Sequence, residues 1–144
     1  MITDSQGNML FPGTELSVPL GFGFRHYGIL AYAANDTPVV LQNTREFGRP
    51  NSVFLEKFRD GKIVQVGRCP VDLFAGIGIV DRAIEELRRG LPWSPWNNCE
   101  DFVNFVITGQ RRSQTREIFE VGATAVFGGL AIGAVLGGGK GLRA

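Results

Sequence analysis

The covalent chemistry open to this sequence rests on one cysteine and on the only histidine of the chain. Cys99 follows Asn98, a residue type that favours the N-cap position, and it opens an apolar stretch that stops at Gly109. The pattern predicts a helix that begins at Cys99. Free N–H groups and the positive end of the helix dipole lower the pKa of a thiol placed there, so we expect a reactive thiolate.

A thiol nucleophile also needs a base, and His26 is the only imidazole in the chain. The two residues can meet if the N-terminus of the Cys99 helix packs against the start of the strand that carries His26. A third residue should orient the imidazole, and we assign this role to Gln42, with Asn43 as the alternate. The backbone N–H of Cys99 is the expected oxyanion donor. The sequence therefore predicts a catalytic set of Cys99, His26 and Gln42.

Two apolar runs should form the hairpin that positions the base and its partner. The first covers residues 25–32 and the second covers residues 39–42, and a turn cluster at 35–38 separates them. This arrangement puts His26 and Gln42 on neighbouring strands.

The remaining strands are predicted from shorter patterns. An alternating run before the hairpin predicts a half-buried strand that ends near Pro19. Residues 45–51 are predicted to form a polar loop. Residues 53–65 are predicted to hold one or two strands around a turn at 60–61, of which 62–66 is the clearer.

After Pro70 the apolar spacing becomes helical. One predicted face carries Ile77, Val80, Ile84 and Leu87, and the opposite face carries Asp81, Arg82, Glu85, Glu86 and Arg88. The helix should end at Gly90. Together with the strands, this helix and the Cys99 helix predict an α+β domain in which helices pack on an antiparallel sheet.

Composition excludes several classes of function. The net charge is +1, so we expect no nucleic-acid partner. Two cysteines and one histidine are too few for a typical zinc site, and no nucleotide-binding loop precedes a helix, so we expect neither a metal nor a cofactor. Cys69 is predicted to lie in the core or in a loop. A domain of this size with ordinary apolar content does not need a disulfide, which favours a reducing compartment.

The end of the chain differs from the rest. Residues 121–139 contain no charged side chain and are about long enough to cross a ~30 Å hydrocarbon core as a helix. We expect a catalytic domain over 1–118 and an apolar helical segment over 119–144 that anchors it on the cytoplasmic side of a membrane. Seven glycines within 121–139 keep open a tail that folds back onto the domain. Residues 1–13 do not form a secretory signal.

The local sequence around the two reactive residues resembles that of the lecithin:retinol acyltransferase family. Residues 98–103, Asn-Cys-Glu-Asp-Phe-Val, resemble its Asn-Cys-Glu-His-Phe-Val box, and residues 25–29 resemble its His box. The order, His before Cys, is a circular permutation of papain and of NlpC-type cell-wall peptidases. Residues 79–83 resemble the family's helix before the Cys box, and residues 109–121 with the apolar tail after them are similar to the H-Ras-like suppressor phospholipase/acyltransferase branch. The likeness spans about residues 13–139.

The resemblance implies a circularly permuted papain-like domain that acts on lipid acyl esters. Cys99 would carry the acyl group, as in an acyltransferase or a phospholipase A-like hydrolase, with phospholipid as the substrate. Gln42 departs from a second His that the family commonly has, and Asp101 departs from the His of the Cys box. Two alternatives remain: a cysteine peptidase or cell-wall amidase on the same fold, and a membrane-associated interaction protein with weak catalysis. The acyl donor, the acyl acceptor and the oligomeric state stay open.

Overall fold

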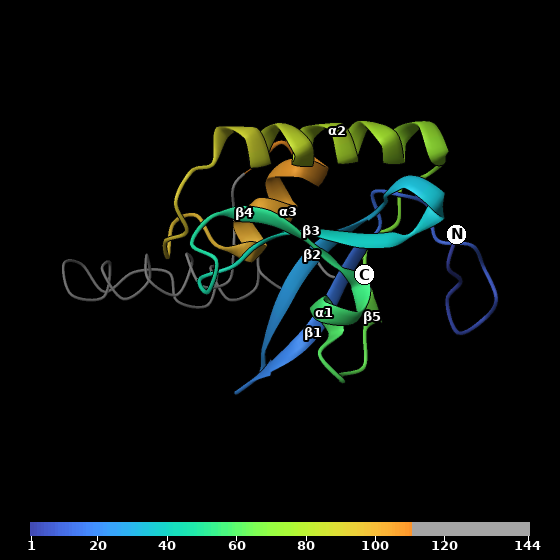
Figure 1. The fold of residues 1–144 in the computed structure, drawn as a ribbon, viewed down its shortest axis with the longest axis horizontal. Helices are drawn as coiled ribbons and strands as arrows, with labels where there is room; N and C mark the ends of the chain where they lie inside the picture. Colours follow the sequence, from blue (N-terminus) through green and yellow to red (C-terminus); the bar gives the residue numbers. More distant parts are fainter. Residues whose placement is uncertain (111–144) are drawn as a thin grey trace, which may run out of the picture.

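The computed structural model describes residues 1–110, which form a five-stranded antiparallel sheet and three α-helices (Figure 1). The strands are β1 (Glu15–Gly21), β2 (Phe24–Tyr32), β3 (Pro38–Asn43), β4 (Pro50–Phe54) and β5 (Gln65–Val66). The helices are α1 (Leu55–Arg59), α2 (Leu73–Arg89) and α3 (Cys99–Thr108). The strands lie in the order β4-β3-β2-β1-β5, which confirms the predicted α+β class.

Helices cover both faces of the sheet (Figure 1). On one face α2 and α3 bury a core that includes Tyr27, Ile29, Ala31, Leu41, Phe102 and Val106. On the other face α1 covers a core that includes Leu16, Val18, Leu30, Val40 and Phe58. Side chains alternate along a strand, so the even-numbered residues of β2 and β3 face α1. His26 and Gln42 belong to this even-numbered set, and they lie on adjacent strands as predicted.

The segment between β3 and β5 differs from the prediction. β4 begins at Pro50, inside the predicted loop, and residues 55–59 form α1 rather than a strand. A helix of one turn is too short to show a helical period in the sequence. It buries a single apolar side chain, Phe58, and its C-cap is Asp60, which has a left-handed backbone with φ 47°. The last strand is also shorter than predicted and covers only Gln65–Val66.

The buried face of helix α2 overlaps only in part with the predicted one, because Val80 and Leu87 pack against the core as expected but the fully buried positions are others. Its buried residues are Gly76, Ile79, Ala83 and Glu86, whereas Ile77 and Ile84 are exposed. The small residues explain the difference, because a Cβ at Gly76 would lie 2.0 Å from the carbonyl oxygen of Pro12. The close approach of Pro12 to Gly76 therefore determines which face of α2 packs against the domain. Glu86 lies on that buried face, so the prediction that it faces away from the core is wrong.

Strand β1 is buried on both sides of its first half, contrary to the predicted alternation, and it runs on to Gly21. Glu15 is 3% exposed and pairs with Arg68, whose Nη2 lies 2.6 Å from Oε2 of the glutamate. The same Nη2 donates to Oδ1 of Asn104 at 2.7 Å. This ion pair joins β1 to the segment after β5 and to α3.

Replacing Arg68 with alanine should destabilise the domain, because the Glu15 carboxylate would stay buried without its cation. Breaking one side of a buried pair is strongly destabilising, so we expect a loss of about 3 kcal/mol in the free energy of unfolding. Arg88→Ala is the control, since Arg88 forms an exposed pair with Glu85 at 3.3 Å. That change should cost less than about 1 kcal/mol. Equal losses for the two variants in urea denaturation would contradict a stabilising role for the buried pair.

Candidate active site

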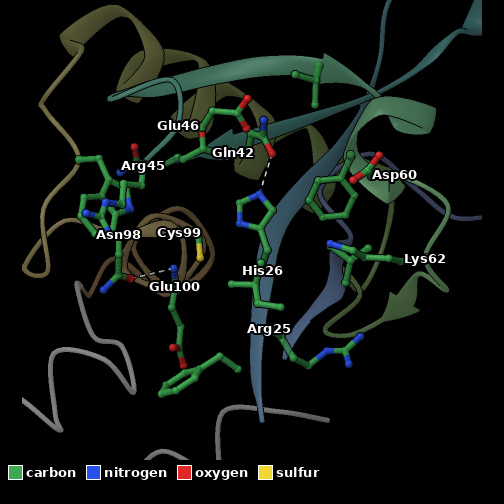
Figure 2. A pocket seen from close by; sticks show the side chains of 18 of the residues that line it. Arg25, His26, Gln42, Arg45, Glu46, Asp60, Lys62, Asn98, Cys99 and Glu100 are labelled. Atoms are coloured by element: carbon green, nitrogen blue, oxygen red, sulfur yellow. Dashed lines mark hydrogen bonds between the residues drawn. The ribbon is translucent and has the colours of Figure 1, made fainter. Parts of the chain in front are cut away.

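A cavity of about 610 Å³ opens where β2, β3, α1 and the start of α3 meet (Figure 2). Its apolar walls come from Val18, Leu20, Phe24, Val53, Phe58 and Trp93. Cys99, His26, Gln42 and Asn43 all line this cavity, so the structure brings the predicted site residues to one place. A volume of this size is typical of a small-molecule site.

The first turn of α3 is held by a reciprocal cap at the residue before Cys99. The Asn98 side chain accepts hydrogen bonds from the N–H groups of Glu100 and Asp101, each at 3.0 Å. In return the Asp101 carboxylate accepts from the N–H of Asn98 at 3.2 Å. This capping box confirms Asn98 as the N-cap, and it buries the Asp101 carboxylate. Cys99 is thereby fixed in the wall of the cavity.

Asn43 serves the start of α3 rather than the imidazole. Its Nδ2 donates to the carbonyl oxygen of Asn97 at 2.9 Å, which ties the end of β3 to the residue before the N-cap. The neighbouring loops are joined as well, because the backbone N–H of Trp93 donates to the Gly48 carbonyl oxygen at 2.8 Å. The Arg45 guanidinium also lies over the Trp93 ring, 5.7 Å from its centre. The strand that carries Gln42 is thus coupled to the helix that carries Cys99.

A chain of side-chain amides orients His26. Nε2 of the ring lies 2.7 Å from Oε1 of Gln42 (Figure 2), and Nε2 of Gln42 donates to Oδ1 of Asn51 at 3.0 Å. Nδ2 of Asn51 donates to the carbonyl oxygen of Arg49 at 2.9 Å. The Arg49 carbonyl oxygen can only accept a hydrogen bond, so the atom of Asn51 that faces it must be the NH₂ nitrogen. The oxygen of Asn51 then faces Gln42, so the atom of Gln42 on that side must also be its NH₂ nitrogen.

This orientation determines the tautomer of the neutral imidazole. The atom of Gln42 that faces the ring is an oxygen, so Nε2 of His26 must carry the proton that it donates. Nδ1 is left as the acceptor. Figure 2 shows the Cys99 sulfur on the side of α3 that faces the His26 ring. Within residues 1–110 no hydrogen bond joins this thiol to the ring, and such contacts often tighten only when substrate binds.

Phe58 supports the other side of the imidazole. The two ring centres lie 5.3 Å apart with an angle of 41° between their planes. Gly28 allows this approach, because a Cβ there would lie 2.3 Å from Cγ1 of Val40 and 3.1 Å from the Phe58 ring. Sequence reasoning missed both Phe58 and Asn51. Phe58 falls in a predicted strand and Asn51 in a predicted loop, and neither has a local pattern that relates it to His26.

Burial makes both reactive groups neutral near pH 7. It raises the pKa of the Cys99 thiol to about 11, although backbone N–H groups of Tyr27 and Glu100 partly oppose this effect. Loss of solvation thus shifts the pKa of the thiol in the direction opposite to the one expected from its place at the helix N-terminus. Burial also lowers the pKa of His26, and the positive charge of Lys62 lowers it further, while the bond to Gln42 acts in the opposite direction.

Cys69 lies outside the cavity. It is exposed in the segment after β5, so of the two predicted locations the loop is correct. A metal site is not apparent either, since no group of three or more His, Cys, Asp or Glu is placed to hold an ion within residues 1–110.

The predicted membrane segment belongs to the part of the chain beyond residue 110. Residues 121–139 and the predicted boundary at 118/119 lie outside the described residues. Among the helices of residues 1–110, none is both long enough and apolar enough to cross a membrane.

Comparison of the chain with protein-family models, with curated proteins and with solved structures gave no match. The resemblance to the lecithin:retinol acyltransferase family therefore stays a prediction from the two sequence boxes. What defines the site is the geometry around Cys99 and His26.

The lone histidine makes the site open to direct titration. His26 should titrate by NMR with a midpoint below 6.5, its ordinary value, because burial disfavours the imidazolium. Gln42→Glu should raise the midpoint by about one pH unit, since a carboxylate at hydrogen-bond distance favours the charged ring. Gln65→Glu, on the exposed end of β5, is the matched control and should leave the midpoint in place. A wild-type midpoint above 6.5, or no shift in Gln42→Glu, would contradict the described environment.

The two thiols should differ in their reaction with iodoacetamide. With a pKa of about 11, Cys99 is about one part in a thousand thiolate at pH 8. Cys69 is exposed and should therefore be alkylated first, as measured by peptide mass spectrometry over time. Faster labelling of Cys99 would show that the free protein holds a thiolate–imidazolium pair instead of two neutral groups.

Proposed function

We propose that this protein is a thiol-dependent acyltransferase or phospholipase A-like hydrolase that acts on lipid acyl esters through a thioester at Cys99. The observation that carries the proposal is the His26 ring, held by Gln42 with Nδ1 free, in the same cavity as the Cys99 thiol. A half-buried thiol, an oriented base and a cavity with apolar walls are parts that acyl transfer to a lipid-derived ester can use.

The first half-reaction starts from neutral groups. As the Cys99 sulfur attacks the ester carbonyl, its proton passes to Nδ1 of His26, and the carbonyl oxygen becomes an oxyanion. The N–H of Cys99, in the first turn of α3, is the donor that we assign to this oxyanion. The imidazolium then gives its proton to the departing alkoxide oxygen, and the acyl group stays on the sulfur as a thioester.

The second half-reaction returns the enzyme to its starting state. Water or an amine attacks the thioester while Nδ1 of His26 takes its proton, and the Cys99 sulfur leaves and is reprotonated by the ring. Gln42 acts as a positioning residue throughout, because its oxygen accepts the Nε2–H of both the neutral and the charged ring. An amide carries no charge and stabilises the imidazolium less than a carboxylate does.

The substrate class follows from the walls of the cavity and from the sequence resemblance. Apolar side chains such as Val18, Val53 and Phe58 suit an acyl chain. The resemblance to the lecithin:retinol acyltransferase family indicates that the acyl donor is a phospholipid. Membrane association through residues 121–139, with the catalytic domain in a reducing compartment on the cytoplasmic side, is part of the same proposal.

The second candidate is an interaction protein that retains the fold and has weak catalysis. The raised pKa of Cys99 favours this candidate, since a neutral thiol is a poor nucleophile until its proton is removed. A peptidase or cell-wall amidase would use the same residues, and the apolar walls argue for an acyl chain over a peptide. Formation of a thioester with a phospholipid separates acyl transfer from both alternatives.

Incubation with a phosphatidylcholine should leave an acyl adduct on Cys99 that intact-protein mass spectrometry detects as the mass of one fatty acyl group. Cys99→Ser should abolish the thioester, whereas Cys69→Ala should retain it, because Cys69 lies outside the cavity. Hydroxylamine at neutral pH should remove the adduct, as expected of a thioester. Loss of the adduct in both variants, or no adduct in the wild-type protein, would count against the proposed reaction.

A further inference from the structure

The hairpin between β1 and β2 presents three apolar side chains to solvent. Phe22, at its tip, is 102% exposed, while Leu20 and Phe24 on either side are 58% and 41% exposed. The hairpin projects from the body of the domain, away from α2 (Figure 1). Leu20 and Phe24 also line the cavity that contains His26, so the apolar tip is continuous with the cavity wall.

The backbone at this tip does not favour a phenylalanine. Phe22 has φ 53° and Gly23 has φ 79°, so both central residues of the turn are left-handed. Turns of this kind favour Asn-Gly, since asparagine and glycine tolerate positive φ better than other residues. Phe22 thus exposes its whole apolar ring to water and strains the backbone, without packing against any part of the domain that the structure describes. An asparagine at this position would avoid both costs.

Cationic residues lie beside the apolar tip. Arg25 follows Phe24, and its Nε donates to Oγ of Ser17 at 2.9 Å. Lys62 lines the same cavity and lies close enough to His26 to affect its pKa. The carboxylates of Glu46, Asp60 and Glu100 line the cavity as well. Insertion therefore depends mainly on the apolar tip, with Arg25 and Lys62 adding attraction to anionic headgroups.

We propose that the β1–β2 hairpin inserts Phe22 into the surface of a bilayer that contains anionic phospholipid, and thereby brings the cavity mouth against the lipid. The part that concerns substrate delivery rests on the proposed function, whereas the lipid contact itself does not. Leu20 and Phe24 extend from the inserted tip to the cavity. An acyl ester would then pass from the bilayer to Cys99 along an apolar wall without crossing water.

The lipid contact is tested in the full chain with tryptophan as a local probe. Phe22→Trp and Phe74→Trp replace two exposed phenylalanines, of which Phe74 lies on α2 at 86% exposure. Emission is compared with that of the wild-type protein, which supplies the background of Trp93 and Trp96. With vesicles of phosphatidylcholine and phosphatidylglycerol brominated in the acyl chain, the emission added by Phe22→Trp should shift to the blue and be quenched. The emission added by Phe74→Trp should do neither.

Equal quenching at the two positions, or none in Phe22→Trp, would overturn the proposal. A blue shift that rises with protein concentration in the absence of vesicles would also overturn it, because the tip would then contact a second copy of the chain.

Phe22→Asn tests the link to turnover. This variant should have a melting temperature equal to or above that of the wild type, because asparagine tolerates positive φ. The ratio of its activity on phospholipid vesicles to its activity on a soluble short-chain ester should fall about tenfold, the loss expected when one buried aromatic contact is removed. An unchanged ratio would overturn the role in delivery. Quenching in Phe22→Trp with no turnover of any ester would instead contradict only the proposed function.

Discussion

The orientation of the base depends on the carbonyl group of Arg49. That oxygen fixes the amide of Asn51, Asn51 fixes the amide of Gln42, and Gln42 leaves the ring of His26 with its proton on Nε2. Taken alone, each side-chain amide could be rotated by about 180° so that its oxygen and nitrogen exchange places, but a backbone carbonyl oxygen can only accept a hydrogen bond. The consequence reaches the site, because Nδ1 becomes the atom that can take a proton from Cys99.

The same packing that holds the groups also favours their neutral forms in the free protein. Burial raises the pKa of the thiol and lowers that of the imidazole, so the proton would have to move as the sulfur attacks. Asn98, Asp101 and Asn43 fix the start of α3, and the amide chain fixes the ring. Such a site depends on prior positioning of its groups rather than on a stored thiolate.

The sequence predicted those parts of the molecule that have a local signal. The N-cap at Asn98 and the strands on either side of residues 35–38 are confirmed, since residue type and periodicity encode them. Features set by tertiary contacts were missed or wrong. The single turn of α1, the packing of Gly76 and the burial of Cys99 each depend on residues distant in sequence.

Gln42 shows the same difference between features with a local sequence signal and features set by tertiary contacts. Its position on the strand beside His26 could be read from the hairpin pattern, and the structure gives it the bond to the ring that Asn43 lacks. Nothing in the sequence near Gln42 indicates Asn51, because the two meet only through the pairing of β3 with β4. The tautomer of His26 therefore could not be predicted from the sequence.

The most direct test of this account is the protonation of the His26 ring in the full-length protein. Two-bond ¹⁵N–¹H correlation spectra at a pH above its titration midpoint distinguish the two neutral tautomers by the nitrogen shifts. The account predicts a ring with its proton on Nε2 and a bare Nδ1, as Gln42 and Asn51 require. A ring protonated on Nδ1 would contradict it, since the nitrogen assigned to accept the Cys99 proton would already be occupied.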